Sequence, residues 1–386
     1  MDNFIYYNPT CIFFGKGEIK QLAIAIDRKL KVLLVYGGGS IKVNRVYDQV
    51  MNALKAHQVL EFSGIEPNPE YETCMKVVEY IHVNNVDFVL AVGGGSVIDA
   101  VKFIVAAAKF KGDPWDILAK NADITEVLPF GSVLTLPATG SEMNNNSVIS
   151  RRAFNKKLFF SHDKVYPVFS ILDPETTYTL PSRQVANGIV DAFVHVMEQY
   201  LTYPQNAPLQ DRFAEGILQT LIEEGQKVLI NPHNYDVRAN IMWAAALALN
   251  TLIEKGVKTD WATHMIGHEL TAIYGLDHAQ TLAIILPNVM KYKREKKADK
   301  LVQYAERVWG VDKALSSEQK INLGIEKTRA FFEKMGNPTT ISAYSLSKGK
   351  FDAIIENLRQ NGRFQLGEHQ DITLEDSRKI LEMSFE

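Results

Sequence analysis

Residues 86–102 read VDFVLAVGGGSVIDAVK, an apolar run that stops at a glycine loop (93–96) and continues as a helical pattern. Lys31–Tyr36 repeats this arrangement and stops at a second GGGS loop (37–40), and Ser132–Pro137 is a third apolar run. Between the first two runs, helical patterns are expected over 41–57 and 71–84. Apolar strands that alternate with helices predict a parallel sheet covered on both faces. The first part of the chain is therefore expected to be an α/β, Rossmann-like domain.

The second part of the chain has a different pattern. Residues 172–181 carry two prolines and a threonine cluster, which indicates a boundary and predicts domains over 1–180 and 181–386. Beyond it, long 3.6-residue periodicities dominate and predict an all-helical domain. Helices are expected over Val185–Leu201, Leu209–Leu229, Val237–Glu254, Trp261–Tyr274 and Ala298–Trp309. The basic run 291–300 also contains acidic residues, which predicts a solvated helix face.

The composition excludes several classes of protein. Of 386 residues, 46% are hydrophobic and 23% charged, which is typical of a folded globular protein. A net charge of −3 provides no general attraction to nucleic acid or to an anionic membrane, and neither partner is expected. Two cysteines exclude a disulfide scaffold, and no apolar stretch approaches a membrane span. With no basic and apolar leader at Met1–Tyr6, a cytoplasmic location is expected.

The glycine loops are suited to binding phosphate. A strand, a glycine-rich turn and a helix place free backbone N–H groups against an anion. The loop at 93–96 is neither the usual dinucleotide fingerprint, because Ile98 stands at the third glycine position, nor a Walker A loop. A tight turn without a ligand is the alternative for one loop, but two loops favour a dinucleotide. Lys102 is expected to reach a phosphate or to point to solvent.

The first loop also bears on the choice of cofactor. An NAD site usually presents an acidic residue to the ribose 2′-hydroxyl, and that charge repels a 2′-phosphate. Residues 35–40 contain no carboxylate, and Lys42 follows closely. If this loop contacts the adenosine ribose, NADP is the better fit.

Histidines and one aspartate form a candidate metal site in the second domain. Asp191 and His195 are four residues apart, as are His264 and His268, and His278 follows. Four-residue spacing on a helix lets two side chains share a metal, and imidazoles with a carboxylate suit Zn²⁺ or Fe²⁺. Each residue alone also fits a structural role, and spacing does not choose between His264 and His268. A zinc peptidase of the H-E-x-x-H type is excluded because residue 272 is alanine.

With these motifs assembled, the chain resembles the iron-containing alcohol dehydrogenase family over nearly its whole length. The matching segments are 93–99, 136–144, 191–195, 264–269 and 275–283. The resemblance is closest to the butanol dehydrogenase and NADPH-dependent aldehyde reductase branch, with its dehydroquinate synthase-like architecture. It implies metal ligands at Asp191, His195, His264 and His278, and a proton-relay role for His268.

The resemblance also implies the cofactor contacts and the reaction. The matching positions are Gly38, Gly39, Ser40, Gly94, Gly95, Ser96, Asp99, Thr135, Thr139, Asn144 and Lys157. Many relatives carry aspartate at the position of Gly39 and use NAD, so the glycine resembles the NADP-using branch. A homodimer that interconverts primary alcohols and aldehydes with NADP(H) and one divalent ion, Fe²⁺ or Zn²⁺, is expected. A glycerol or polyol dehydrogenase and a dehydroquinate-synthase-like lyase are the alternatives on the same fold.

Overall fold

The structure is a computed structural model that describes residues 1–154 and 156–386. It divides into two compact units. The sheet unit comprises Tyr7–Pro181 and Pro232–Ala246, and the helical unit comprises Met1–Tyr6, Ser182–Asn231 and Leu247–Glu386. Residues 232–246 thus belong to the sheet unit although they follow residue 181 in the chain. The domain boundary between residues 180 and 181 stays a prediction.

A six-stranded parallel sheet forms the centre of the sheet unit. Its order is β1-β8-β5-β4-β2-β3, and every pairing in it is parallel. The strands are β1 (Cys11–Phe14), β2 (Lys31–Tyr36), β3 (Gln58–Ser63), β4 (Phe88–Gly94), β5 (Phe130–Leu136) and β8 (Phe169–Leu172). β2, β4 and β5 are the three runs that the sequence predicts as strands, and they lie side by side.

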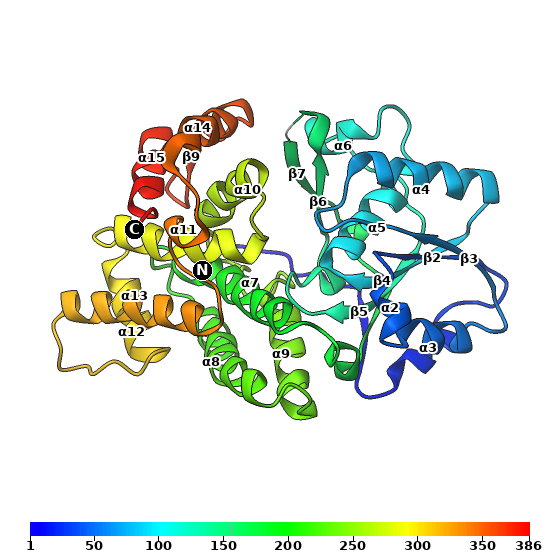
Figure 1. Ribbon diagram of the computed structural model, residues 1–386, viewed down its shortest axis with the longest axis horizontal. Coiled ribbons are helices and arrows are strands. Elements are labelled where there is room, and N and C mark those ends of the chain that lie inside the picture. Colours follow the sequence, from blue (N-terminus) through cyan, green and yellow to red (C-terminus); the bar gives the residue numbers. More distant parts are fainter. Residues whose placement is uncertain (155) are drawn as a thin grey trace. The chain divides into compact units, whose positions relative to one another are not determined.

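Apolar cores lie on both faces of this sheet. Val32 and Leu34 pack into one core, while Leu33 and Val35, which alternate with them along β2, pack into the other. α2 and α3 contribute to the first core, and α4 and α5 contribute to the second (Figure 1). The continuous apolar runs in the sequence exist because neither face of these strands meets solvent. The predicted α/β class is confirmed.

The helices of the sheet unit follow the sequence pattern with one break. They are α1 (Leu22–Ala25), α2 (Ser40–Val43), α3 (Val46–Ala53), α4 (Tyr71–Asn84), α5 (Gly95–Ala107), α6 (Trp115–Ala119) and α9 (Tyr235–Ala248), the last two residues of which belong to the helical unit. The helical pattern between residues 41 and 57 is divided into α2 and α3, because Arg45 takes a left-handed conformation with φ of 66°. An antiparallel hairpin of β6 (Asn146–Arg151) and β7 (Lys156–Ser161) was not predicted.

The helical unit consists mainly of eight helices, of which the sequence predicts four. They are α7 (Ser182–Tyr200), α8 (Pro208–Ile230), α10 (Ala262–Tyr274), α11 (His278–Tyr292), α12 (Ala298–Arg307), α13 (Ser317–Lys334), α14 (Phe351–Gln360) and α15 (Leu374–Met383). A two-stranded ladder, β9 (Gln365–Leu366) with β10 (Ile372–Thr373), interrupts the helical pattern. Among the described residues, no helix combines the length and the apolar character needed to cross a membrane.

Candidate metal centre and nucleotide-binding loops

The first glycine loop leaves β2 with an open backbone. Gly39 has φ of 98°, a left-handed conformation that favours glycine, and it directly precedes Ser40 at the start of α2. A Cβ added at Gly38 or Gly39 would meet no atom within 4 Å. The loop therefore exposes its backbone to a ligand. Lys42 lies 3.7 Å from Glu61 of β3 and over the ring of Tyr47.

The second glycine loop is in close contact with the loop that follows β5. Gly94 ends β4 and Gly95 begins α5, so the free N–H groups of that helix lie at the loop. A Cβ at Gly95 would lie 2.3 Å from Oγ1 of Thr139, a distance that real side chains do not adopt. Thr135 lies in β5, beside β4, and is buried. Glycine is required here because the side chain of Thr139 lies directly against the backbone of Gly95.

A buried polar cluster holds the loop after β5 against α5. Ser141 donates its Oγ–H to Asp99 at 2.5 Å, and the N–H of Val148 donates to the other carboxylate oxygen at 3.0 Å. The Lys102 ammonium donates to Ser141 Oγ, Asn144 Oδ1 and the carbonyl of residue 146, each at 2.8 Å. The alternative that Lys102 points to solvent was wrong, because this side chain is fully buried. A contact with phosphate stays a prediction. Both α5 residues fix the position of the loop that carries Thr139 and Asn144.

Burial changes the proton affinities in this cluster. It lowers the pKa of the Lys102 ammonium to about 8, against the opposing effect of Asp99 and Glu142. Burial also raises the pKa of Asp99, and it raises that of Glu142 to about 7. Neither carboxylate oxygen of Glu142 has a hydrogen-bond partner among the described residues. The cluster therefore holds one well-bonded lysine and a glutamate that takes up a proton more readily than an exposed one does.

All eleven residues named as cofactor contacts lie in the sheet unit, and all except Lys157 lie on the two glycine loops, on α5, on β5 or on the loop that follows β5. Asn144 donates to the carbonyl of Thr139 at 3.3 Å, and Lys157 of β7 donates to Asn68 Oδ1 at 2.8 Å. The structure thus brings Thr139, Asn144 and Gly95 together. The role of each residue towards a nucleotide stays a prediction.

Two helices of the helical unit bring the predicted metal ligands together. Asp191 and His195 lie on α7 and His264 lies on α10, and one ligand atom from each lies within 4.8 Å of the others. All three residues are buried, with exposed fractions of 4–5%. Asp191 Oδ1 lies 3.8 Å from His195 Nε2 and 3.6 Å from Nε2 of His278. His278 comes from a third helix, α11, and lies beside this group of three.

The donor set suits a divalent transition metal. Ligand atoms about 2.1 Å from a tetrahedral ion lie roughly 3.4 Å apart, which is close to the two separations around Asp191. Three imidazoles and one carboxylate are ligands for Zn²⁺ or Fe²⁺ rather than for Ca²⁺ or Mg²⁺. The residues present therefore fit the metal that the sequence pattern predicts.

The position of His278 is fixed by two sets of hydrogen bonds to the preceding residue, Asp277. Asp277 is the N-cap of α11, where a capping box with Gln280 starts the helix. The same carboxylate accepts a hydrogen bond from Asn187 Nδ2 at 2.9 Å. Asn187 lies one turn before Asp191 on α7. This tether brings the first residue of α11 beside the metal-binding face of α7.

Glu198 is a functional residue that the sequence reasoning missed. It accepts hydrogen bonds from the backbone N–H of Thr263 at 2.6 Å and of His264 at 3.2 Å, and it also contacts Nδ1 of the His264 ring. With Nδ1 engaged by a carboxylate, a metal would bind His264 through Nε2. Glu198 follows Asp191 by seven residues and His195 by three, so helical periodicity places all three on one face of α7. This spacing could have identified Glu198 from the sequence.

His268 lies beside the ligand group, one turn further along α10. Its ring centroid is 5.2 Å from that of His278 and 6.2 Å from that of His264. Neither His268 nor His278 belongs to the group of three whose ligand atoms cluster, but His278 Nε2 lies 3.6 Å from Asp191 Oδ1. The location of His268 fits a group that acts on a substrate next to the metal.

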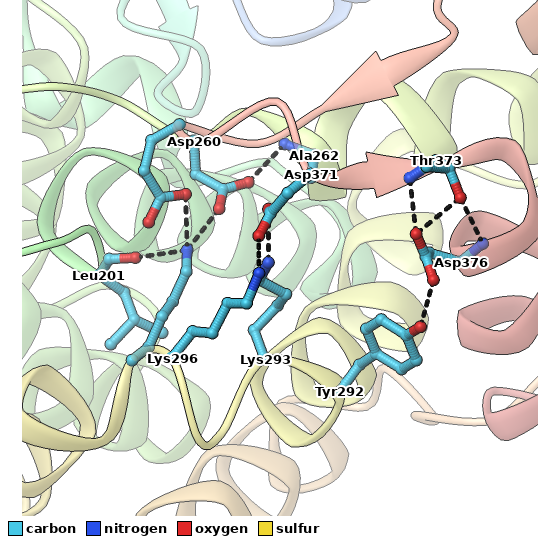
Figure 2. A network of polar contacts seen from close by, with 11 residues as sticks. Leu201, Asp260, Ala262, Tyr292, Lys293, Lys296, Asp371, Thr373 and Asp376 are labelled. Carbon is cyan, nitrogen blue, oxygen red and sulfur yellow. Dashed lines mark hydrogen bonds and ion pairs between the residues drawn. The ribbon is translucent and has the colours of Figure 1, made fainter.

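A buried ion-pair network anchors the segment before α10. Figure 2 shows Asp260 between Leu201 and Ala262, whose backbone N–H donates to the Asp260 carboxylate at 2.8 Å. Lys297 forms an ion pair with Asp260 and donates to the carbonyl of Leu201 at 2.8 Å. It also lies 3.1 Å from Glu368, and its side chain is 3% exposed. The predicted solvated face of the basic run 291–300 was wrong here, because carboxylates from distant segments bury this lysine.

Comparisons with known proteins agree with this geometry. The family model "Iron-containing alcohol dehydrogenase" matches residues 9–174, and "Fe-containing alcohol dehydrogenase family, C-terminal" matches residues 185–385. The chain is 56% identical to the NADPH-dependent aldehyde reductase YqhD of Escherichia coli, over 99% of each chain. It is 42% identical to a probable NADH-dependent butanol dehydrogenase of Bacillus subtilis over 100% of each. The crystal structure of YqhD superimposes with a TM-score of 0.98 over 99% of each chain.

Proposed function

This chain belongs to the iron-containing alcohol dehydrogenase family, and on that premise we propose that it is an NADP-dependent alcohol dehydrogenase and aldehyde reductase. Its substrates are primary alcohols and the corresponding aldehydes, of the size of butanol and butanal. The observation that carries the proposal is that Asp191, His195 and His264 are buried with their ligand atoms close together, in a chain whose other unit carries two glycine loops at the ends of parallel strands. A small-molecule substrate follows from this chemistry.

When bound, the metal supplies Lewis acidity towards the substrate oxygen, and NADP(H) supplies or accepts the hydride. Asp191, His195, His264 and His278 hold the ion. Glu198 keeps the His264 ring oriented through its contact with Nδ1. The donor set itself does not choose between Fe²⁺ and Zn²⁺, since both accept imidazole and carboxylate ligands.

His268 is the proposed proton donor in aldehyde reduction. It gives a proton to the substrate oxygen, directly or through water, and takes it back during alcohol oxidation. Its position supports this role: His268 lies next to His278 and follows His264, the predicted metal ligand, by one turn on the same face of α10. The ring therefore acts on the substrate without holding the metal.

The glycine loops bind the two ends of the nucleotide. Backbone N–H groups at Gly94, Gly95 and Ser96 hold the pyrophosphate, and Gly38, Gly39 and Ser40 face the ribose. The glycine at position 39 places no carboxylate against a 2′-phosphate, and YqhD is described as NADPH-dependent. Asp99 and Lys102 act by holding the Thr139 loop in place, because their polar groups are bonded to that loop.

The experiment that tests this function is butanal reduction by metal-reconstituted protein, followed as NADPH and then as NADH oxidation. We expect turnover that a chelator abolishes, with a strong preference for NADPH. Turnover that prefers NADH would refute the cofactor assignment and leave the dehydrogenase intact. Absence of turnover with either cofactor, in protein shown to hold metal, would refute the dehydrogenase and favour the polyol dehydrogenase or the lyase.

We also propose a homodimer in the cytoplasm, on the basis of the family resemblance and the two cysteines of the sequence. Light scattering coupled to size-exclusion chromatography measures the mass directly. A mass near twice 43.4 kDa is expected, and a mass of one chain would refute the dimer.

A further inference from the structure

One aromatic side chain lies against the metal-binding histidines. The Trp261 ring centroid is 5.2 Å from that of His264, in an edge-to-face arrangement, and 6.3 Å from that of His195. Residues 260 and 262–264 are buried, whereas Trp261 is only partly buried. The indole therefore covers the edge of the ligand group and keeps accessible surface of its own.

Trp261 and His268 lie at opposite ends of one row of side chains. His264 and His268 are four positions apart and lie on one face of α10, and Trp261 is the N-cap residue directly before that helix. His264 is in the middle of this row, since its ring lies 5.2 Å from Trp261 and 6.2 Å from His268. In this row, His268 is the proposed proton donor, His264 is the predicted metal ligand and Trp261 is the apolar residue.

The backbone at Trp261 is held in an unfavourable conformation. Its φ of 62° and ψ of 7° lie in the left-handed region, which bulky residues avoid. The residues on either side are fixed. Asp260 donates its N–H to the carbonyl of Glu198 at 2.8 Å. Its carboxylate accepts a hydrogen bond from Ala262 N–H at 2.8 Å (Figure 2). Such a conformation persists only where its surroundings determine it, and here they aim the side chain at the histidines.

The polar group of the indole is already satisfied. Trp261 Nε1–H donates to Oγ1 of Thr259 at 2.9 Å, which fixes the ring orientation. The surface that remains for a ligand consists of carbon atoms and the π face. This surface is suited to an alkyl chain rather than to a hydroxylated or charged group.

We propose that Trp261 is the specificity-determining residue that packs against the alkyl chain of a straight-chain aldehyde or alcohol. The inference rests on the proposed function, because the carbonyl group must lie at the metal for its chain to reach the indole. The substrate then spans this row of side chains: its oxygen lies at the centre, within reach of His268, and its carbon chain extends towards Trp261. This assigns a preference for unbranched aliphatic substrates of more than two carbons.

Two measurements test this assignment in the metal-loaded protein. The first is kcat/KM for ethanal, propanal, butanal and hexanal in the wild type and in Trp261→Ala. We expect the value to rise with chain length in the wild type, since each buried methylene contributes about threefold to tenfold. In Trp261→Ala the butanal value should fall about tenfold or more, while the ethanal value changes less than about threefold.

The second measurement is independent of turnover. Calorimetric titration with acetamide and butanamide, which carry a carbonyl but are not reduced, gives the ratio of their dissociation constants. We expect the wild type to bind butanamide about tenfold more tightly than acetamide, and Trp261→Ala to bind the two amides with equal affinity. A wild type that binds both amides in this ratio but reduces no aldehyde would refute the proposed function and support the chain-binding role.

Three controls separate chain binding from support of the ligand. Trp261→Phe keeps an apolar ring and should keep the dependence on chain length. Trp243→Ala removes a tryptophan that is 39% exposed on α9 and packs on Phe14, and should change nothing. Metal content is measured in each protein. Equal losses for all four aldehydes in Trp261→Ala, or loss of its metal, would overturn the proposal and make Trp261 a support for His264. An unchanged chain-length profile would overturn it as well.

Discussion

Glu198→Gln is the substitution that most directly tests how the metal centre is organised. The carboxylate has two acceptor oxygens and serves three groups: the N–H of Thr263, the N–H of His264 and Nδ1 of the His264 ring. Glutamine has nearly the same shape but only one acceptor oxygen. If that oxygen stays on Thr263, the amide NH₂ faces two donors of His264, and if the amide flips, Thr263 loses its acceptor.

Either orientation leaves a buried donor without an acceptor and turns the His264 ring. An unsatisfied buried hydrogen-bonding group costs about 1–3 kcal/mol. Loss of the carboxylate that orients a metal-binding histidine typically weakens metal binding by about 10–100-fold, which corresponds to about 1.4–2.8 kcal/mol. We therefore expect the dissociation constant for Zn²⁺ to rise about 10–100-fold, together with a separate loss of folding stability of about 1–3 kcal/mol.

The assay is competition for Zn²⁺ between the protein and a chromophoric chelator. Glu215→Gln is the matched control, because Glu215 is also a buried glutamate of the helical unit but bonds to Arg212, Arg307 and Tyr200. The control should leave Zn²⁺ affinity unchanged. If a folded Glu198→Gln protein binds Zn²⁺ within threefold of the wild type, then the carboxylate does not orient His264 and the reasoning is refuted.

Four further predictions concern single positions. Asp191→Asn should lose most of its metal, measured by elemental analysis, and nearly all of its activity; full metal retention would contradict its assignment as a ligand. His268→Ala should keep its metal and lower the turnover number by about 10²–10⁴-fold, and an unchanged turnover number would exclude it as proton donor. Gly95→Ala should raise the KM for NADPH and leave metal content unchanged, because its Cβ would lie 2.3 Å from Thr139 Oγ1; an unchanged KM would show that the loop adapts without cost. Folding raises the pKa of Glu142 from 4.5 to about 7, so the folded state binds more protons in this range, and wild-type stability should fall with rising pH by up to roughly 3 kcal/mol between these values. Glu142→Gln should remove this slope in urea denaturation, and an identical slope in both proteins would show that Glu142 is not its origin.

The parts of the fold that are local in the sequence were predictable. Lys31–Tyr36 and Tyr71–Asn84 form a strand and a helix with the expected bounds, because in each the apolar residues repeat with the period of one element. The break at Arg45 was not predictable in this way. It depends on a left-handed residue of a type that rarely adopts that conformation.

The candidate metal site was predictable in part, for a related reason. Spacing indicated which histidines share a helix face, but His278 reaches Asp191 only through the tether between Asp277 and Asn187. This contact joins residues 90 positions apart, so it could not be predicted from either segment of the sequence alone. Spacing also did not separate His264 from His268, and the structure groups the ligand atoms of His264 with those of α7.

Buried charges were the least predictable feature. Lys102 and Lys297 look like ordinary surface lysines in the sequence, and each is bonded to residues that lie more than thirty positions away. A lysine is buried only where such partners are supplied by the tertiary structure. Charge patterns within one segment therefore indicate solvation correctly only when no distant carboxylate or carbonyl reaches that segment.

The interleaving of the two units has a consequence for how this chain folds during synthesis. The segment 232–246, which contains most of α9, supplies Met242 and Ala246 to a core of the sheet unit, and Trp243 packs on Phe14 of β1. That helix leaves the ribosome roughly fifty residues after the rest of the sheet unit, a delay of about 3–10 s at ordinary rates of synthesis. During this interval the nascent sheet unit exposes the apolar surface that α9 later covers, and a fragment that ends at residue 181 would expose it permanently.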